Sequence, residues 1–237
     1  MGVGYAASAL HRTFYLVTEE RAAAPAEPPP ELAQILPGAK WGGPAKFHGI
    51  PLADVLRWRE QLAEKYWSQL GEVLTWDEES DFEAAEDTST SADVQLHYLA
   101  ALIDDRGPEM LPDLIGTGKP SHEEFERAFS AVERRGFTSR FPQLLLGAMH
   151  WLPFERNLII EEPDWRGTVR RFGSSERLME EIIDLRDLIL ETDARVADWN
   201  PDQQLDDLLG AAWQASETVA RIGAIAVARH LPLWTTG

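Results

Sequence analysis

The sequence predicts an α+β fold that is predominantly α-helical, with about six helices and a small antiparallel sheet of three to four strands. Several segments place apolar residues three or four positions apart, which is the period of a helix with one buried face. Between residues 143 and 172, short apolar runs alternate with loops that contain Pro or Gly, as in antiparallel strands. Strands and helices do not alternate regularly along the chain, so Rossmann-type and barrel folds are not expected.

We expect a single domain over residues 1–237, because 44% of the residues are hydrophobic and a chain of this length can bury one sizeable core. The sequence contains no Cys. A disulfide scaffold, a thiolate metal site and a Cys nucleophile are therefore excluded.

The N-terminal third of the chain contains one expected strand and one expected connector. Residues 10–17, LHRTFYLV, are rich in aromatic and β-branched side chains, which favour a strand. Residues 21–44 are rich in Pro, Gly and Ala and are typical of a connector, with one helical turn expected at residues 31–36. A helix is expected to begin near Pro51, since proline suits the first helical position, and to end at Gly71.

An acidic loop is expected at residues 72–90, followed by a helix over residues 91–105. The next helix is expected to begin at Ser121. Glu124 stands three residues later, and Ser followed by Glu at this distance is the pattern of a capping box.

Residues 143–149, 157–162 and 167–172 are expected to form an antiparallel meander, with Pro153 and Pro163 in its connections. A helix should follow over residues 175–191. Asn200 and Pro201 predict the start of a last helix that runs to about residue 230. The last helix contains small residues that would let neighbouring elements pack closely; these are Ala212, Ala215, Ala220, Gly223, Ala224 and Ala228.

The negative charge of the chain is concentrated in one region. The formal net charge is −18, and residues 66–105 contain eleven Asp and Glu but no Lys or Arg. The remaining 29 acidic residues stand against 22 basic ones. Residues 127–177 have the opposite balance, with nine Arg and six acidic residues. The two regions could therefore face each other within one fold or across a homodimer.

A field of this sign repels nucleic acid and anionic membranes and attracts basic proteins. No apolar run approaches the length of a membrane span, and the first residues lack the basic region of an export signal. We therefore expect a soluble, cytoplasmic protein whose partner is a basic protein, with no role for nucleic acid or membrane.

The acidic region does not match a calcium loop. Asp77, Glu79 and Asp81 have the spacing of the first three EF-hand ligands, but Phe82 replaces the turn glycine and Thr88 replaces the final Glu. Residues 116–121, GTGKPS, lack the first glycine of a phosphate-binding loop and its Ser or Thr. The sequence therefore predicts neither a metal nor a cofactor.

The first functional hypothesis is a binding protein that occludes a basic partner, most concretely a bacterial-type immunity (antitoxin-like) protein that inhibits a toxin. Acidic side chains would supply the electrostatic field, and the two aromatic residues Trp76 and Phe82 would anchor the partner. The opposite interpretation is that both aromatic residues attach the loop to the protein's own core. The expected partner-binding residues are Trp76, Asp77, Glu78, Glu79, Asp81, Phe82, Glu83, Glu86 and Asp87.

The alternative hypothesis is a hydrolase-like enzyme acting on a small molecule, with an acid/base cluster near the sheet. Its candidate catalytic residues are His150, Glu155, Glu161 and Glu162, with Arg156 or Arg170 holding an anionic substrate. Glu161 and Glu162 cannot both line one pocket if the strand persists, because neighbouring strand residues point to opposite faces. A third alternative is a scaffold protein that self-associates through its acidic and Arg-rich regions.

Overall fold

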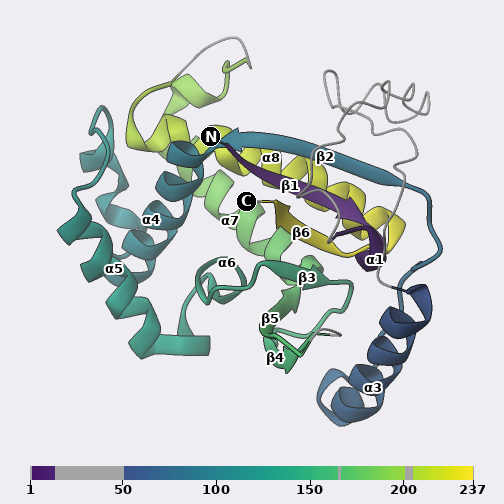
Figure 1. Ribbon diagram of the computed structural model, residues 1–237. Coiled ribbons are helices and arrows are strands. Elements are labelled where there is room, and N and C mark those ends of the chain that lie inside the picture. Colours follow the sequence, from purple (N-terminus) through teal and green to yellow (C-terminus); the bar gives the residue numbers. More distant parts are fainter. Residues whose placement is uncertain (1, 14–50, 165–166, 201–204, 237) are drawn as a thin grey trace.

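The computed structural model describes residues 2–13, 51–164, 167–200 and 205–236 (Figure 1). Within these residues the fold is α+β, with seven α-helices and one mixed sheet of six strands. The predicted fold class is therefore confirmed, whereas the predicted three to four antiparallel strands are too few and miss one parallel pair. In sheet order the strands are β2 (Glu83–Ser89), β1 (Gly2–Ser8), β6 (Leu233–Thr236), β3 (His150–Leu152), β5 (Val169–Ser174) and β4 (Ile160–Pro163).

Four of the predicted helices are confirmed with nearly the expected bounds. Their ends are set locally, by Gly71 in the left-handed conformation after the first and by serine caps at the starts of the other three. The predicted capping box of Ser121 and Glu124 is present. These helices are α3 (Leu52–Leu70), α4 (Thr90–Arg106), α5 (His122–Arg135) and α7 (Ser175–Thr192).

The N-terminal strand lies earlier than predicted. β1 has the sequence GVGYAAS, and its small residues are poor strand formers, but it lies between β2 and β6 with its last five residues buried. The first half of the strand predicted at residues 10–17 is instead the short helix α1 (Leu10–Thr13), and residues 14–17 lie outside the described part of the chain. The predicted connector at residues 21–44 and its helical turn at residues 31–36 lie outside the described residues.

The acidic segment at residues 72–90 is only partly a loop. Residues Glu83–Ser89 form β2, which pairs with β1 in antiparallel register from Gly2 opposite Ser89 to Ser8 opposite Glu83. The sequence EAAEDTS did not predict a strand because Glu, Ala and Asp are depleted in strands. Pairing with β1, whose residues lie 75 to 87 positions away from their partners in the sequence, overrides that preference.

The predicted meander is wrong in its first strand and in how that strand pairs, whereas the antiparallel pairing of its second and third strands is confirmed. Residues 142–145 form the short helix α6 (Pro142–Leu145), and β3 begins only at His150. β3 pairs in parallel with β5, whereas β4 pairs with β5 in antiparallel register. Pro163, predicted in a connection, is the last residue of the edge strand β4, a position that proline tolerates.

The last helix, α8 (Leu208–Arg229), begins later than predicted, because the side chain of Asp207 caps it and Pro201 lies outside the described residues. Gly223 permits close packing as expected, since a Cβ atom there would lie 2.2 Å from the sulfur of Met179 in α7. The chain then returns to the sheet as β6, which was not predicted. Three short 3₁₀ helices complete the connections: Pro108–Leu114, Gly136–Thr138 and Ala194–Val196.

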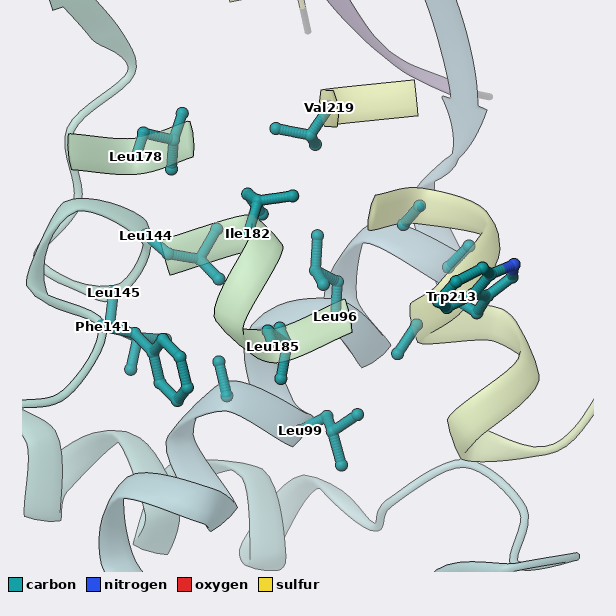
Figure 2. Close-up of a cluster of buried hydrophobic side chains, with 14 of the residues drawn as sticks. Leu96, Leu99, Phe141, Leu144, Leu145, Leu178, Ile182, Leu185, Trp213 and Val219 are labelled. Atoms are coloured by element: carbon teal, nitrogen blue, oxygen red, sulfur yellow. The ribbon is translucent and has the colours of Figure 1, made fainter. Parts of the chain in front are cut away.

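The two faces of the sheet bury different cores. α8 runs along β1 and β2 on one face, and α4 and α7 pack against α8 (Figure 1). Figure 2 shows part of this larger core, where side chains of α4, α6, α7 and α8 meet. α3 lies on the other face, where Val55, Trp58 and Leu62 pack with Ile160 and Phe172. In the described part of the chain, no helix is long and apolar enough to span a membrane.

Candidate interaction surface

The acidic segment begins with an alternation of buried and exposed residues. Leu74, Trp76 and Glu78 are buried, while Asp77 and Glu79 are exposed. An extended chain points successive side chains to opposite sides, so one side of this segment is attached to the protein and the other faces solvent. The direction in which each acidic side chain points therefore decides whether it belongs to the surface.

Trp76 is an internal anchor. Its side chain is only 4% exposed and packs in the smaller core with Trp58 of α3. The guanidinium of Arg59 lies 5.4 Å from the ring centroid and donates a 2.6 Å hydrogen bond to the Trp76 carbonyl oxygen. This placement agrees with the interpretation in which Trp76 attaches the segment to the protein's own core.

Glu78 is a buried carboxylate with several donors around it. It accepts hydrogen bonds from the backbone N–H groups of Leu10 and His11 at the start of α1, and from the indole N–H of Trp76. The Nδ1 atom of His11 lies 3.0 Å from its Oε1 atom. Glu78 is 2% exposed and its carboxylate accepts these hydrogen bonds. It therefore stabilises the fold and is not available to a partner.

Phe82 holds the other end of the segment. Its side chain is partly buried against the larger core, and the guanidinium of Arg229 lies 4.0 Å from its ring centroid. Trp76 and Phe82 thus bracket the exposed residues Asp77, Glu79 and Asp81. Asp77 also accepts a 3.1 Å hydrogen bond from the backbone N–H of Glu79, which fixes the turn between them.

The remaining predicted residues lie on β2. Glu86 points toward α8, where Arg221 binds it at 3.0 Å through Nε. Asp87 is exposed, and Glu83 is half-buried. Asp77, Glu79, Asp81 and Asp87 therefore form the solvent-facing set, which we call the acidic surface. Trp76, Glu78 and Glu86 are turned toward the protein.

Sequence reasoning missed the cations that fix this segment. Arg59 precedes Trp76 by 17 positions, and Arg221 follows Glu86 by 135 positions. No local pattern connects residues at these separations. The period-two alternation from Leu74 to Glu79 was the one available signal that Glu78 is turned inward.

The four residues of the alternative catalytic site do not converge. His150 is 4% exposed and its ring centroid lies 5.7 Å from that of Phe172; burial together with Arg170 lowers its pKa to about 4. Glu161 is exposed and pairs with Arg171 at 3.0 Å. Glu155 is exposed in the loop beside Glu72, whose carboxylate accepts its backbone N–H.

Glu162 lies on the opposite side of β4 from Glu161, as predicted for neighbouring strand residues. It binds Lys65 and accepts a 2.6 Å hydrogen bond from the hydroxyl of Tyr66. Burial and this bond raise the pKa of Tyr66 to about 12. Both partners belong to α3, so Glu162 attaches that helix to the edge of the sheet.

An open cavity of about 600 Å³ lies between α3 and the end of β4. Three carboxylates on its wall, Asp54, Glu162 and Asp164, each have a cationic partner. Asp164 is the buried member of this set, and Arg170 binds it at 2.6 Å. Among the described residues, no group of three or more His, Asp or Glu side chains is placed to hold a metal ion.

The fold and surface together define a mixed-sheet α+β protein with an acidic segment fixed along one sheet edge. Comparisons of the chain with protein-family models, with curated proteins and with solved structures give no match. The functional interpretation therefore depends on the geometry of the acidic surface.

Proposed function

We propose that the protein is a binding protein that presents its acidic surface to a basic protein partner. The most concrete version is an immunity (antitoxin-like) protein that neutralises a toxin in the cytoplasm. The observation that carries the proposal is the way in which the acidic segment is held. Trp76 and Glu78 fix it from inside, while Asp77, Glu79, Asp81 and Asp87 face solvent.

A fixed acidic surface suits recognition because the charges are ordered before the partner arrives. Ordering side chains and loops at an interface opposes binding, so a surface that is already held in place loses less entropy. Clustered charge of one sign also accelerates encounter with an oppositely charged protein.

The enzyme alternative has less support. His150, Glu155, Glu161 and Glu162 lie in different surroundings, and the carboxylates that line the cavity beside α3 have cationic partners. A general acid or base needs to reach the same substrate atom as its catalytic partners, and these groups are not brought together.

The test uses a variant in which four exposed acids are neutralised: Asp77→Asn, Glu79→Gln, Asp81→Asn and Asp87→Asn. The variant and the wild type are tested against basic proteins encoded by genes that neighbour the gene of this chain, and an unrelated basic protein serves as a specificity control. We expect the association rate at low salt to fall at least ~10-fold, since steering by charge is lost. Stopped-flow measurements at several salt concentrations should also show a flatter salt dependence.

A matched control carries the same change of net charge elsewhere: Glu109→Gln, Asp113→Asn, Glu126→Gln and Glu133→Gln, all at exposed positions. This control should associate nearly as fast as the wild type. Equal slowing of both variants would mean that only total charge matters. Unchanged association in the first variant would refute the proposed function.

A further inference from the structure

The two edges of the sheet are built differently. β4 has four residues and ends with Pro163, which cannot donate a main-chain hydrogen bond. The carbonyl oxygen of Pro163 accepts a 2.8 Å hydrogen bond from the indole of Trp58 in α3. A short strand that ends in proline and is covered by a helix is protected against pairing with another chain.

Among the described residues, β2 at the other edge has none of these protections. It has seven residues and no Pro, and it pairs along its whole length with β1 on one side. On its other side, the described part of the chain contributes no strand. A regular strand in this position presents a row of main-chain donors and acceptors to solvent.

The orientation of the β2 amides follows from that of β1. The backbone N–H of Ser8 donates a hydrogen bond to the carbonyl oxygen of Pro232, the residue before β6. This N–H therefore points toward β6 and away from β2. Successive N–H groups of a strand point in opposite directions, so the N–H of Ala7 points toward β2. Ala84 is opposite Ala7 and is therefore turned inward, whereas the N–H groups of Ala85 and Asp87 point outward.

The outer edge of β2 is also negatively charged. Glu83, Ala85 and Asp87 share one face of the strand because they alternate with Ala84 and Glu86. Asp87 is exposed and Ala85 is half-buried. A strand placed beside β2 would therefore meet the outward-facing N–H groups of Ala85 and Asp87. On one face of the sheet it would also meet the carboxylates of Glu83 and Asp87, which stand two positions before and after Ala85.

We propose that the outer edge of β2 binds a basic β-strand of the partner protein by main-chain pairing. This inference rests on the proposed function and names its mode of recognition. Hydrogen bonds to Ala85 and Asp87 supply affinity, and a Lys or Arg of the added strand pairs with the exposed carboxylate of Asp87.

Charge selects this occupant over a second copy of the chain. Two β2 strands placed edge to edge would bring Glu and Asp residues of both copies together, and like charges on neighbouring strands destabilise a pair. Acidic side chains thus protect the edge against self-association while leaving it open to a basic strand.

The first test measures hydrogen exchange of individual amides by NMR in the full chain at low salt. The probe is a capped seven-residue peptide that alternates Lys with Val or Thr, matching the length of β2. At millimolar peptide, exchange at Ala85 and Asp87 should slow at least ~5-fold, because their N–H groups acquire acceptors. The inward amide of Glu86 serves as the internal reference, and a peptide with Glu in place of Lys is the matched control.

The second test separates backbone from charge. Ala85→Pro removes one outward N–H and keeps every charge, and it leaves the hydrogen bonds to β1 in place. It should weaken binding of the Lys peptide and of the partner protein at least ~10-fold while changing Tm little. The single change Asp87→Asn keeps the backbone and should weaken binding mainly at low salt.

The outcomes are distinguishable. Unchanged exchange at Ala85 and Asp87 with the Lys peptide, or equal slowing with the Glu peptide, overturns the pairing mode. Exchange that slows with protein concentration alone assigns the edge to a second copy and also overturns it. If Ala85→Pro binds the partner as the wild type does while neutralising the acids weakens binding, edge pairing is wrong and the proposed function stands.

Discussion

At the residue scale, Glu78 and Glu79 show how neighbouring acids serve different ends. Glu78 lies among the backbone N–H groups of α1 and the Trp76 indole, and it is 2% exposed. Glu79 is exposed one position later. The internal carboxylate holds the segment in place, so the exposed one is presented in a fixed position.

This difference predicts unequal effects on stability. Glu78→Ala should lower the free energy of unfolding by about 3 kcal/mol, because it leaves buried donors without an acceptor. Glu79→Ala, the matched control, should change it by less than ~0.5 kcal/mol. Urea denaturation of both variants at pH 7 measures the difference, and similar values for the two would contradict the role assigned to Glu78.

A second buried carboxylate, Glu181 of α7, predicts how stability depends on pH. It accepts hydrogen bonds of 2.9 Å from the N–H groups of Gln143 and Leu144 at the start of α6. Burial raises its pKa from 4.5 to about 8, against the opposing effect of these bonds. Between these two values the folded chain binds more protons at this site than the unfolded chain does.

Stability should therefore fall as the pH rises through this window, and the loss is complete above pH 8. We expect the free energy of unfolding to be on the order of 3 kcal/mol lower at pH 9 than at pH 6. Urea denaturation across this range is the measurement. Glu181→Gln cannot ionise and should show a flatter profile; parallel profiles for the two proteins would rule out Glu181 as the cause.

At the scale of elements, β5 depends on a close approach between main chain and side chains. A Cβ atom at Gly173 would lie 2.5 Å from the Oε1 atom of Gln143 and 2.6 Å from Cδ1 of Trp151. The same Gln143 oxygen accepts the N–H of Ser174 at 2.8 Å. A side chain at position 173 would thus separate α6 and β3 from β5.

Gly173→Ala should lower the free energy of unfolding by about 2 kcal/mol, since overpacking forces these buried groups apart. Gly118→Ala is the control, because a Cβ atom there meets nothing within 4 Å and the residue has no positive φ angle. Thermal unfolding followed by circular dichroism compares the two. Equal Tm values would mean that Gln143 and Trp151 move aside without loss.

The same scale explains what the sequence could predict. The bounds of α4 and α5 follow from caps and periodicity within the segment itself, so local patterns suffice. β1 and β2 are rich in Gly, Ala and acidic residues and exist as strands because they pair with each other across the chain. β6 is only four residues long and lies after the last helix, where no repeated pattern can develop.

Prediction of the acidic surface was limited in the same way. Local composition located the acids, and the structure places Asp77, Glu79, Asp81 and Asp87 in solvent. The inward orientation of Glu86 depends on Arg221 in α8, a contact between distant parts of the sequence. Composition therefore predicts where charge lies along the chain, while the side from which it is presented is set by tertiary pairing.

At the scale of the whole molecule, the Arg-rich region (residues 127–177) forms ion pairs with one end of the acidic region (residues 66–105). Arg135 binds Asp104 and Asp105 at the end of α4, at 3.1 Å in each case. The acids of the acidic surface lie elsewhere, on the segment before β2 and on β2 itself. Charge within the fold is therefore compensated around α5 and concentrated along the β2 edge.

This imbalance predicts a cost in stability at low salt. With a net charge of −18, Tm should rise by roughly 3–6 °C between 10 and 300 mM NaCl, because salt screens the repulsion. Neutralising Asp77, Glu79, Asp81 and Asp87 together should raise Tm at low salt and reduce this salt dependence. The charge-matched control at Glu109, Asp113, Glu126 and Glu133 should gain less, because three of these four acids have an arginine within three positions in the sequence. Equal gains would mean that the repulsion is spread over the molecule. A larger gain at the acidic surface, combined with slower association, would mean that these acids are kept for binding at the expense of stability.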